Sequence, residues 1–148
     1  MAPIVSSVEI ARPPEEVFQY VTDTSRLPEW QESAVEARQE GSGPPTVGSR
    51  SVVTRRVGRG ERRMTMELTD YSPPRRWGGR GIDGPVRGIF NGTVEPLEDG
   101  ARSRVTLELD FEGHGIGKLL VPLVRRQVRD ELPKNHQHLK ERLETSSS

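Results

Sequence analysis

The chain of 148 residues is long enough for one domain that buries about 70% of its unfolded surface. It contains no cysteine, which excludes a disulfide framework, a thiolate nucleophile and a cysteine metal site. Its net charge is zero, with 31% hydrophobic and 30% charged residues, and this low apolar content indicates a thin core or one that a ligand helps to fill.

The N-terminal part predicts a strand followed by two short helices. Ile4, Val8 and Ile10 share one face of the first strand. Pro14 suits a first helical turn, where a missing N–H costs little. A second short helix is expected to end near Trp30. Because helices this short are marginal in water, both need a surface to pack against.

The middle of the chain predicts about six strands. Beyond the second helix the apolar period changes to two, and Val35 and Ala37 are expected to face inward. After the turn GSGPPTVG, two strands join at residues 58–60. Further strands are expected around Trp77, over residues 86–94, and over ARSRVTLELDF, where the alternation is clearest. Such one-sided alternation is typical of an antiparallel sheet with one face in water.

The C-terminal part predicts one long helix that reaches about Glu144. Its apolar stripe consists of Val128, Leu132, His136, Leu139 and Leu143. Pro122 and Pro133 each remove a backbone hydrogen bond and permit a kink. Residues 116–121 therefore form either a separate turn or the bent start of the same helix. Neither a repeat nor a linker divides the chain, so we expect a single domain over residues 1–148.

Several classes of function are not expected from this sequence. No stretch approaches the roughly 20 apolar residues of a membrane span, and the start MAPIVSSVEI lacks the pattern of a signal peptide. We therefore expect a cytoplasmic protein without integral membrane association. The arginines of residues 50–63 lack base-stacking aromatic neighbours, so no nucleic-acid partner is expected. The three histidines lack metal-site spacing, so no metal is expected.

Four stretches of the sequence resemble the START-like superfamily, also called SRPBCC or birch-pollen-allergen-like. They are RPPEEVFQYVTD followed by LPEW, VGSRSVVTRRV, LTDYSPPRRW, and DGARSRVTLELDFE before the long helix. Within the superfamily they are most similar to the bacterial group called polyketide cyclase/dehydrase and lipid transport. The resemblance implies an α+β helix-grip fold, in which a curved antiparallel sheet of about six or seven strands wraps around the C-terminal helix. The two short helices would close one end of the hollow, with Phe18 and Trp30 as anchors.

The resemblance also implies a class of ligand. Members of this group bind apolar or amphipathic small molecules such as polyketides, sterols, lipids and quinones, and some close rings or remove water. We therefore expect the protein to bind a hydrophobic ligand in an internal cavity. It would either catalyse the cyclisation or dehydration of that ligand or, as a lipid or quinone carrier, only transport it. A third alternative is a membrane-surface adaptor in which GIGKLLVPLVRRQVR lies on anionic lipid. No cofactor is implied, and the oligomeric state is left open.

The expected cavity wall draws on the short helices, the sheet and the long helix. Its residues are Phe18, Trp30, Met64, Met66, Trp77, Phe90, Leu107, Leu109, Val128 and Leu132.

Three side chains are candidates for chemistry. By the family's geometry His136 would lie in or beside the cavity. A neutral imidazole in that position can take a proton from a carbon between two carbonyls. The alternative is that His136 is a partly buried histidine with a packing role only. Arg55 would hold a carboxylate or a developing enolate. Tyr20 would assist or stack on the ligand. Glu131, by contrast, is expected to be a solvated partner of basic side chains on the helix.

Overall fold

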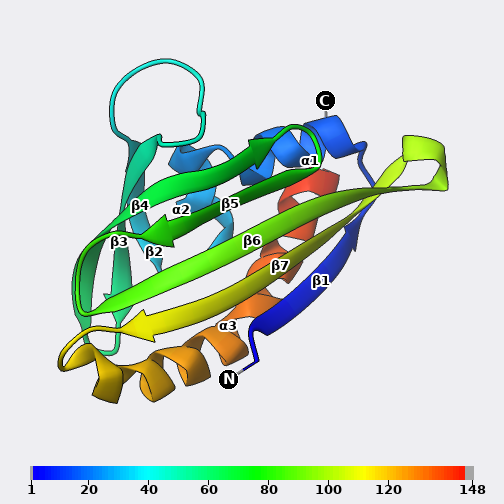
Figure 1. The fold of residues 1–148 in the computed structure, drawn as a ribbon. Helices are drawn as coiled ribbons and strands as arrows, with labels where there is room; N and C mark the ends of the chain where they lie inside the picture. The colour runs from blue at the N-terminus through cyan, green and yellow to red at the C-terminus, as the bar shows by residue number, and fades with distance from the viewer. Residues whose placement is uncertain (1, 146–148) are drawn as a thin grey trace.

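The computed structural model describes residues 2–145, which form a seven-stranded antiparallel sheet curled around one long helix (Figure 1). The elements are, in chain order, β1 (Ile4–Ile10), α1 (Pro14–Val21), the 3-10 turn η1 (Thr24–Arg26), α2 (Leu27–Trp30), β2 (Ala34–Gln39), β3 (Arg50–Val57), β4 (Gly60–Ser72), β5 (Arg76–Gly81), β6 (Val86–Leu97), the 3-10 turn η2 (Glu98–Gly100), β7 (Arg102–Gly113) and α3 (Gly117–Thr145). The strand order in the sheet is β1-β7-β6-β5-β4-β3-β2. This confirms the predicted α+β helix-grip fold.

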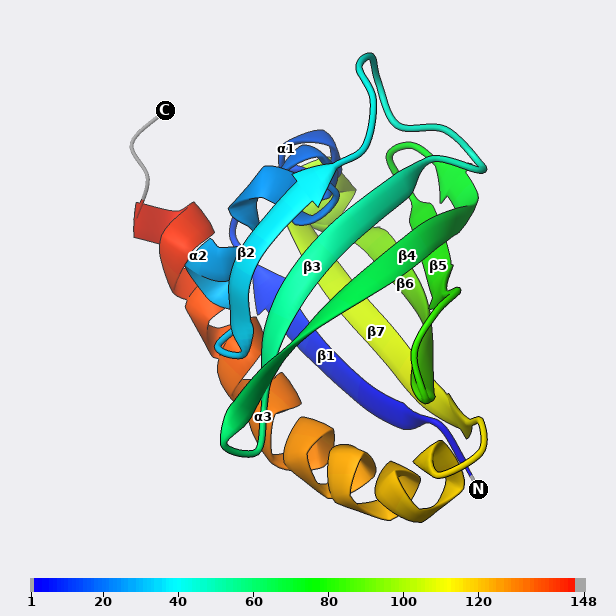
Figure 2. The same cartoon turned by 90° about the vertical axis from the view of Figure 1, so that its left-hand side faces the viewer.

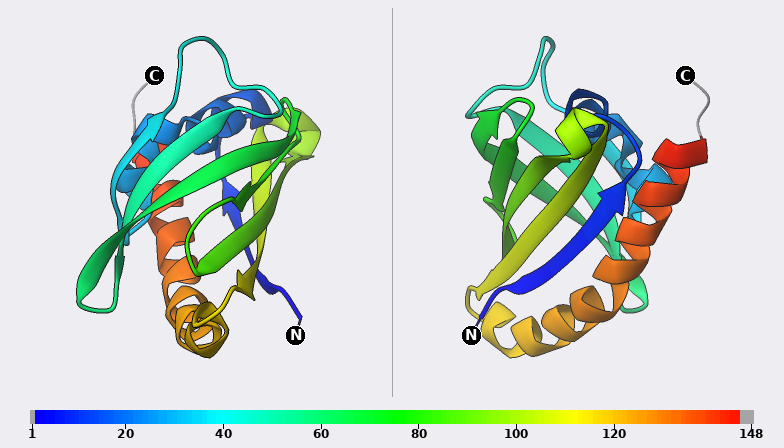
Figure 3. Two further views of the ribbon diagram at one scale, coloured as in Figure 1. Left: turned by 60° about the vertical axis from the view of Figure 1, so that its left-hand side comes forward. Right: turned by 90° about the vertical axis from the view of Figure 1, so that its right-hand side faces the viewer.

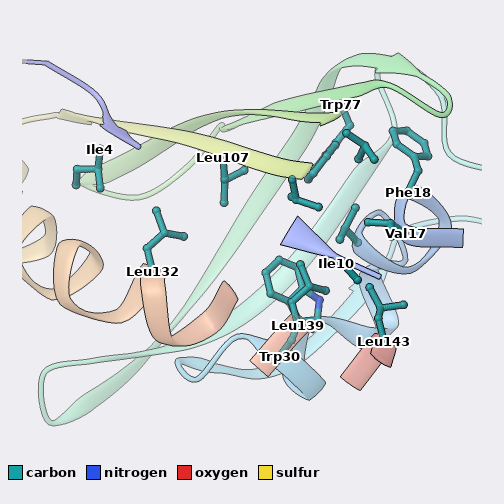
Figure 4. Close-up of a cluster of buried hydrophobic side chains, with 13 residues drawn as sticks. Ile4, Ile10, Val17, Phe18, Trp30, Trp77, Leu107, Leu132, Leu139 and Leu143 are labelled. Atoms are coloured by element: carbon teal, nitrogen blue, oxygen red, sulfur yellow. The ribbon is translucent and has the colours of Figure 1, made fainter. Parts of the chain in front are cut away.

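The C-terminal half of α3 forms the main core with the strands at one edge of the sheet. β1 runs beside α3 (Figure 3, right) and pairs with β7. Leu132, Leu139 and Leu143 are buried and join Ile10 and Trp30 in one apolar cluster (Figure 4). The burial of this stripe stabilises α3 and fixes its direction across the sheet.

α3 is one helix with a clear bend (Figure 2). Residues 117–121 belong to it, so the second of the two predicted alternatives, a bent start of the same helix, is correct. Pro122 and Pro133 lie inside the helix, where each lacks the N–H that would bond one turn back and favours a kink.

The prediction is wrong for one side chain of β2, that of Val35, whereas Ala37 is half-buried and Glu36 and Arg38 are exposed as expected. Val35 is 38% exposed, whereas its neighbour Ala34 is buried. The pairing of β2 with β3 is irregular between Ala34 and Glu36. Val35 is the extra residue at this bulge, which breaks the inward and outward alternation, so a pattern of period two assigns Val35 to the wrong side.

The start of α3 lies directly on the loop between β5 and β6. A Cβ atom added to Gly117 would come within 1.8 Å of the carbonyl oxygen of Pro85. The same carbonyl accepts a hydrogen bond of 2.8 Å from the backbone N–H of His114. The glycines of the sequence EGHGIG therefore allow the helix to begin in contact with this loop.

We expect Gly117→Ala to lower the free energy of unfolding by roughly 1–3 kcal/mol, because the helix start or the loop must move to admit the methyl group. Gly60→Ala is the matched control, since a Cβ there meets nothing within 4 Å. Urea unfolding of both variants measures the difference. An unchanged midpoint for Gly117→Ala would show that α3 does not begin in this contact.

Candidate ligand-binding cavity

A cavity of about 870 Å³ lies between the sheet and α3. This volume is in the range of pockets that enclose small molecules, roughly 300–1,000 Å³. The structure places every predicted wall residue except Phe18 on this cavity: Trp30, Met64, Met66, Trp77, Phe90, Leu107, Leu109, Val128 and Leu132.

Glycines on the curled sheet help to keep this space open. Gly79 on β5 and Gly88 on β6 line the cavity at positions where another residue would project a side chain. The ring of Phe90 already lies over Gly79, and a Cβ there would come within 2.7 Å of it. The rings of Phe90 and Phe111 therefore lie over glycine backbone of the sheet and form this part of the wall.

The two short helices close one end of the cavity. Leu27 and Trp30 of α2 line it directly. Phe18 of α1 lies behind this wall, where its ring centroid is 5.6 Å from that of Tyr71 and 5.9 Å from that of Trp77. Burial of Phe18 and Trp30 in the core supplies the external support that helices of this length need.

The cavity meets solvent at the other end. All of its wall residues that are exposed lie there, and we call them the cavity mouth: Arg56, Gly58, Arg62 and Arg63 of the β3–β4 hairpin, Asp83 and Gly84 of the β5–β6 loop, and Leu123 of α3. The Gln127 side chain donates a hydrogen bond of 3.2 Å to the carbonyl of Arg56 and so ties the hairpin to α3. Figure 2 shows this hairpin and the first half of α3 at the end of the molecule away from α1 and α2.

A polar cluster interrupts the apolar wall. The guanidinium of Arg55 on β3 lines the cavity and donates a hydrogen bond of 3.2 Å to the hydroxyl of Ser33. Burial lowers the pKa of Arg55, and the nearby carboxylate of Glu131 opposes that shift. Since the pKa of arginine starts very high, Arg55 keeps its positive charge.

Glu131 is the partner that the sequence did not assign to the site. It is partly accessible and interacts with an arginine, as expected, but it lines the cavity from α3 and that arginine is Arg55 on β3. Burial raises the pKa of Glu131, whereas the charge of Arg55 and hydrogen bonds from Ser33 act in the opposite direction. Its spacing of three residues from Val128, another wall residue, was the available signal, because such pairs share a helix face.

The connection between α2 and β2 holds this cluster in place. The backbone N–H of Arg56 donates to the carbonyl of Ser33 at 2.9 Å. The backbone N–H of Glu32 donates to the side-chain oxygen of Asn135 on α3 at 2.9 Å. Ser33 is therefore fixed between β3 and α3, which positions the Arg55–Ser33–Glu131 cluster from three separate segments.

His136 faces β1 and is not among the residues that line the cavity. Its side chain is 2% exposed, and its Nδ1 forms a hydrogen bond of 3.0 Å with the hydroxyl of Ser6. Its Nε2 has no hydrogen-bond partner within residues 2–145. Burial lowers the pKa of His136 to about 4, so the imidazole is neutral at pH 7.

Tyr20 also lies outside the cavity wall. Its hydroxyl donates a hydrogen bond of 2.8 Å to the carboxylate of Glu29, and the guanidinium of Arg26 lies 5.3 Å from the centre of its ring. Burial, followed by the interaction with Glu29, raises the pKa of Tyr20 to about 12. Of the three predicted chemical candidates, only Arg55 is on the wall.

Within residues 2–145, no group of three histidine or acidic side chains is arranged to hold a metal ion. None of the helices in this range is both long enough and apolar enough to cross a membrane.

The curled sheet, the long helix and the enclosed cavity define a START-like helix-grip domain. The family model described as polyketide cyclase / dehydrase and lipid transport matches residues 1–144, and the chain belongs to this family. No protein with curated annotation matches the chain.

Solved structures share this fold at low sequence identity. A START superfamily protein from Mycobacterium smegmatis has a TM-score of 0.79 at 15% identity, over 97% of this chain and 98% of that one. The Zhui aromatase/cyclase from a Streptomyces species has a TM-score of 0.77 at 15% identity, over 96% and 93%. The di-domain ARO/CYC BexL has a TM-score of 0.73 at 17% identity over 95% of this chain, which spans only 46% of that protein.

The buried His136 predicts a pH dependence of stability. Its pKa in the folded state, about 4, lies below the ordinary 6.5, so on acidification the unfolded chain takes up this proton first. The folded state therefore loses stability between pH 6.5 and about 4, by roughly 1.4 kcal/mol per pH unit and roughly 3 kcal/mol in total from this residue.

Urea unfolding at several pH values tests this. Between pH 6.5 and about 4, we expect the free energy of unfolding of His136→Gln to fall by roughly 3 kcal/mol less than that of the wild type. His138→Gln, which changes an exposed histidine on the same helix, should follow the wild type. Parallel pH profiles for the wild type and His136→Gln would contradict the buried, neutral state.

Proposed function

We propose that the protein binds an amphipathic small molecule, polyketide- or lipid-like, inside the cavity. The observation that carries the proposal is a large apolar cavity with the partly buried Arg55 on its wall. Such a combination is typical of small-molecule sites, in which apolar surface supplies affinity and a few polar groups fix orientation. The family description, which names polyketides and lipids, supports the same class of ligand.

The polar cluster favours a ligand with carbonyl or hydroxyl groups. Arg55 has five N–H donors, and within residues 2–145 Ser33 is the one hydrogen-bond partner of its guanidinium. The remaining donors can bind a ligand oxygen. Because Glu131 already balances the charge of Arg55, a neutral ketone suits this cluster better than a carboxylate does.

A cyclisation of the bound ligand is the second candidate function, favoured by the position of Glu131 beside Arg55. A carboxylate with a raised pKa is a stronger base near neutral pH. Glu131 would take a proton from a carbon between two carbonyls, and the C–H electron pair would pass to an enolate oxygen that Arg55 stabilises. The aromatase/cyclase name of one structural neighbour supports this role.

The remaining steps of this candidate reaction need only a folded substrate. The enolate carbon would attack a second carbonyl of the same chain and form a C–C bond, and the resulting alkoxide would take the proton back from Glu131. Loss of that hydroxyl with a neighbouring hydrogen, as water, completes a dehydration. The cavity would contribute by holding the two carbons in contact. This proposal assigns no proton transfer to His136 or Tyr20, because neither lines the cavity.

The binding role of Arg55 is tested with a matched pair of ligands, 1-phenyldecane-1,3-dione and 1-phenyldecane, each displacing the neutral dye Nile red. The wild type should prefer the diketone. Arg55→Met should weaken diketone binding by about 10- to 100-fold, the worth of a charge-assisted hydrogen bond, and leave the hydrocarbon nearly unchanged.

Two further variants complete this test. Arg38→Met, which removes an exposed arginine of β2, is the control and should bind both ligands as the wild type does. Arg55→Met combined with Glu131→Gln leaves no unbalanced charge in the wall and should show the same loss of preference. If both Arg55 variants lost affinity equally for the diketone and for the hydrocarbon, Arg55 would support the fold and not contact the ligand.

Catalysis is tested separately by deuterium exchange at the carbon between the two carbonyls of the diketone, followed by NMR in D₂O. We expect the wild type to exchange it faster than buffer alone, and Glu131→Gln to lose about 10²-fold or more of this excess while it still binds the diketone. Exchange no faster than in buffer, with binding intact, would contradict the cyclase role and leave a carrier.

A further inference from the structure

The start of α3 exposes an apolar stripe beside the cavity mouth. Ile116, Leu119 and Leu123 are 70%, 76% and 64% exposed. Their spacing places them along one side of the helix start. Leu123 is also a wall residue, so the stripe continues the apolar lining of the cavity onto the surface. Neighbouring exposed side chains of this size mark an interaction site more often than scattered ones do.

Positive charge predominates beside this stripe, with Asp83 the one acidic residue of the cavity mouth. The arginines of the cavity mouth, Arg56, Arg62 and Arg63, form no ion pair with a described residue. Residues 114–129 contain no aspartate or glutamate, and Lys118 and Arg126 in this stretch are exposed. Because the whole chain has zero net charge, the protein as a whole does not attract anions, and any attraction comes from this basic face.

We propose that this face, made of the cavity mouth and the exposed stripe of α3, docks on the surface of an anionic lipid bilayer. Apolar side chains next to arginine and lysine match the boundary between acyl chains and phosphate headgroups. The stripe borders the entrance, so an apolar ligand passes between bilayer and cavity without crossing water. That passage rests on the proposed ligand-binding function, whereas the docking itself does not.

Flotation with vesicles tests the docking. The protein should float with phosphatidylcholine vesicles that contain about 30% phosphatidylglycerol and remain unbound with phosphatidylcholine alone. Raising the salt from about 0.05 to about 0.5 M should lower the bound fraction strongly, because the Debye length shrinks severalfold.

Two double variants test the two parts of the face without changing the cavity wall. Ile116→Ser with Leu119→Ser removes apolar area. Arg59→Glu, at the exposed turn of the β3–β4 hairpin next to the mouth arginines, combined with Lys118→Glu reverses charge. Each double variant should weaken vesicle binding by about tenfold or more. Their controls are Val47→Ser, a residue 60% exposed in the β2–β3 loop, and Arg38→Glu on β2. Both controls should float as the wild type does.

The outcomes separate docking from ligand binding. Leu109→Trp, which fills the cavity, should lose Nile red but still float, so docking stands even if ligand binding fails. Absence of flotation with intact Nile red binding would overturn the docking alone, as would equal flotation of the variants and their controls. A change of sedimentation coefficient in Ile116→Ser with Leu119→Ser, without vesicle binding, would instead assign the face to a second copy of the chain.

Discussion

The structure depends on α3 being held at both of its ends while the sheet curls away from its middle. Near its start, Gly117 rests on the carbonyl of Pro85, and Arg125 bonds to the carboxylate of Asp110 on β7 at 3.0 Å. At its end, Leu139 and Leu143 are buried in the main core. Between these anchors the helix spans the concave sheet without filling it, and the space that remains is the cavity.

The anchors also decide which chemistry faces the cavity. The last turns of α3, with Leu139 and Leu143, are buried in the core, and His136 packs against β1 through its bond to Ser6. The two charged groups of the polar cluster come from the middle of the helix and from β3, where Glu131 and Arg55 interact near Ser33. Partly buried opposite charges in a largely apolar wall are costly unless they are hydrogen-bonded, which is consistent with a functional role for the cluster.

Much of this arrangement could be predicted from the sequence, because strand alternation reports directly which side chains share a sheet face. The alternation over residues 101–111 predicts one shared face for Leu107 and Leu109, and both line the cavity. Period alone could not reveal the bulge that turns Val35 outward. The stripe that contains Val128 and His136 looked uniform, yet the former lines the cavity and the latter packs on β1. That division depends on the bend of α3, and the approach of Glu131 to Arg55 joins segments far apart in the chain, so neither is visible in local sequence.

The most direct measurement of the central claim is a Nile red titration of the wild type beside Leu109→Trp and Val47→Trp. If the cavity binds ligands, the wild type and Val47→Trp should each bind one dye molecule per chain saturably, because residue 47 lies in an exposed loop. Leu109→Trp, whose indole fills the cavity, should bind the dye with about tenfold or more lower affinity. Equal affinity of all three proteins would contradict an internal binding site.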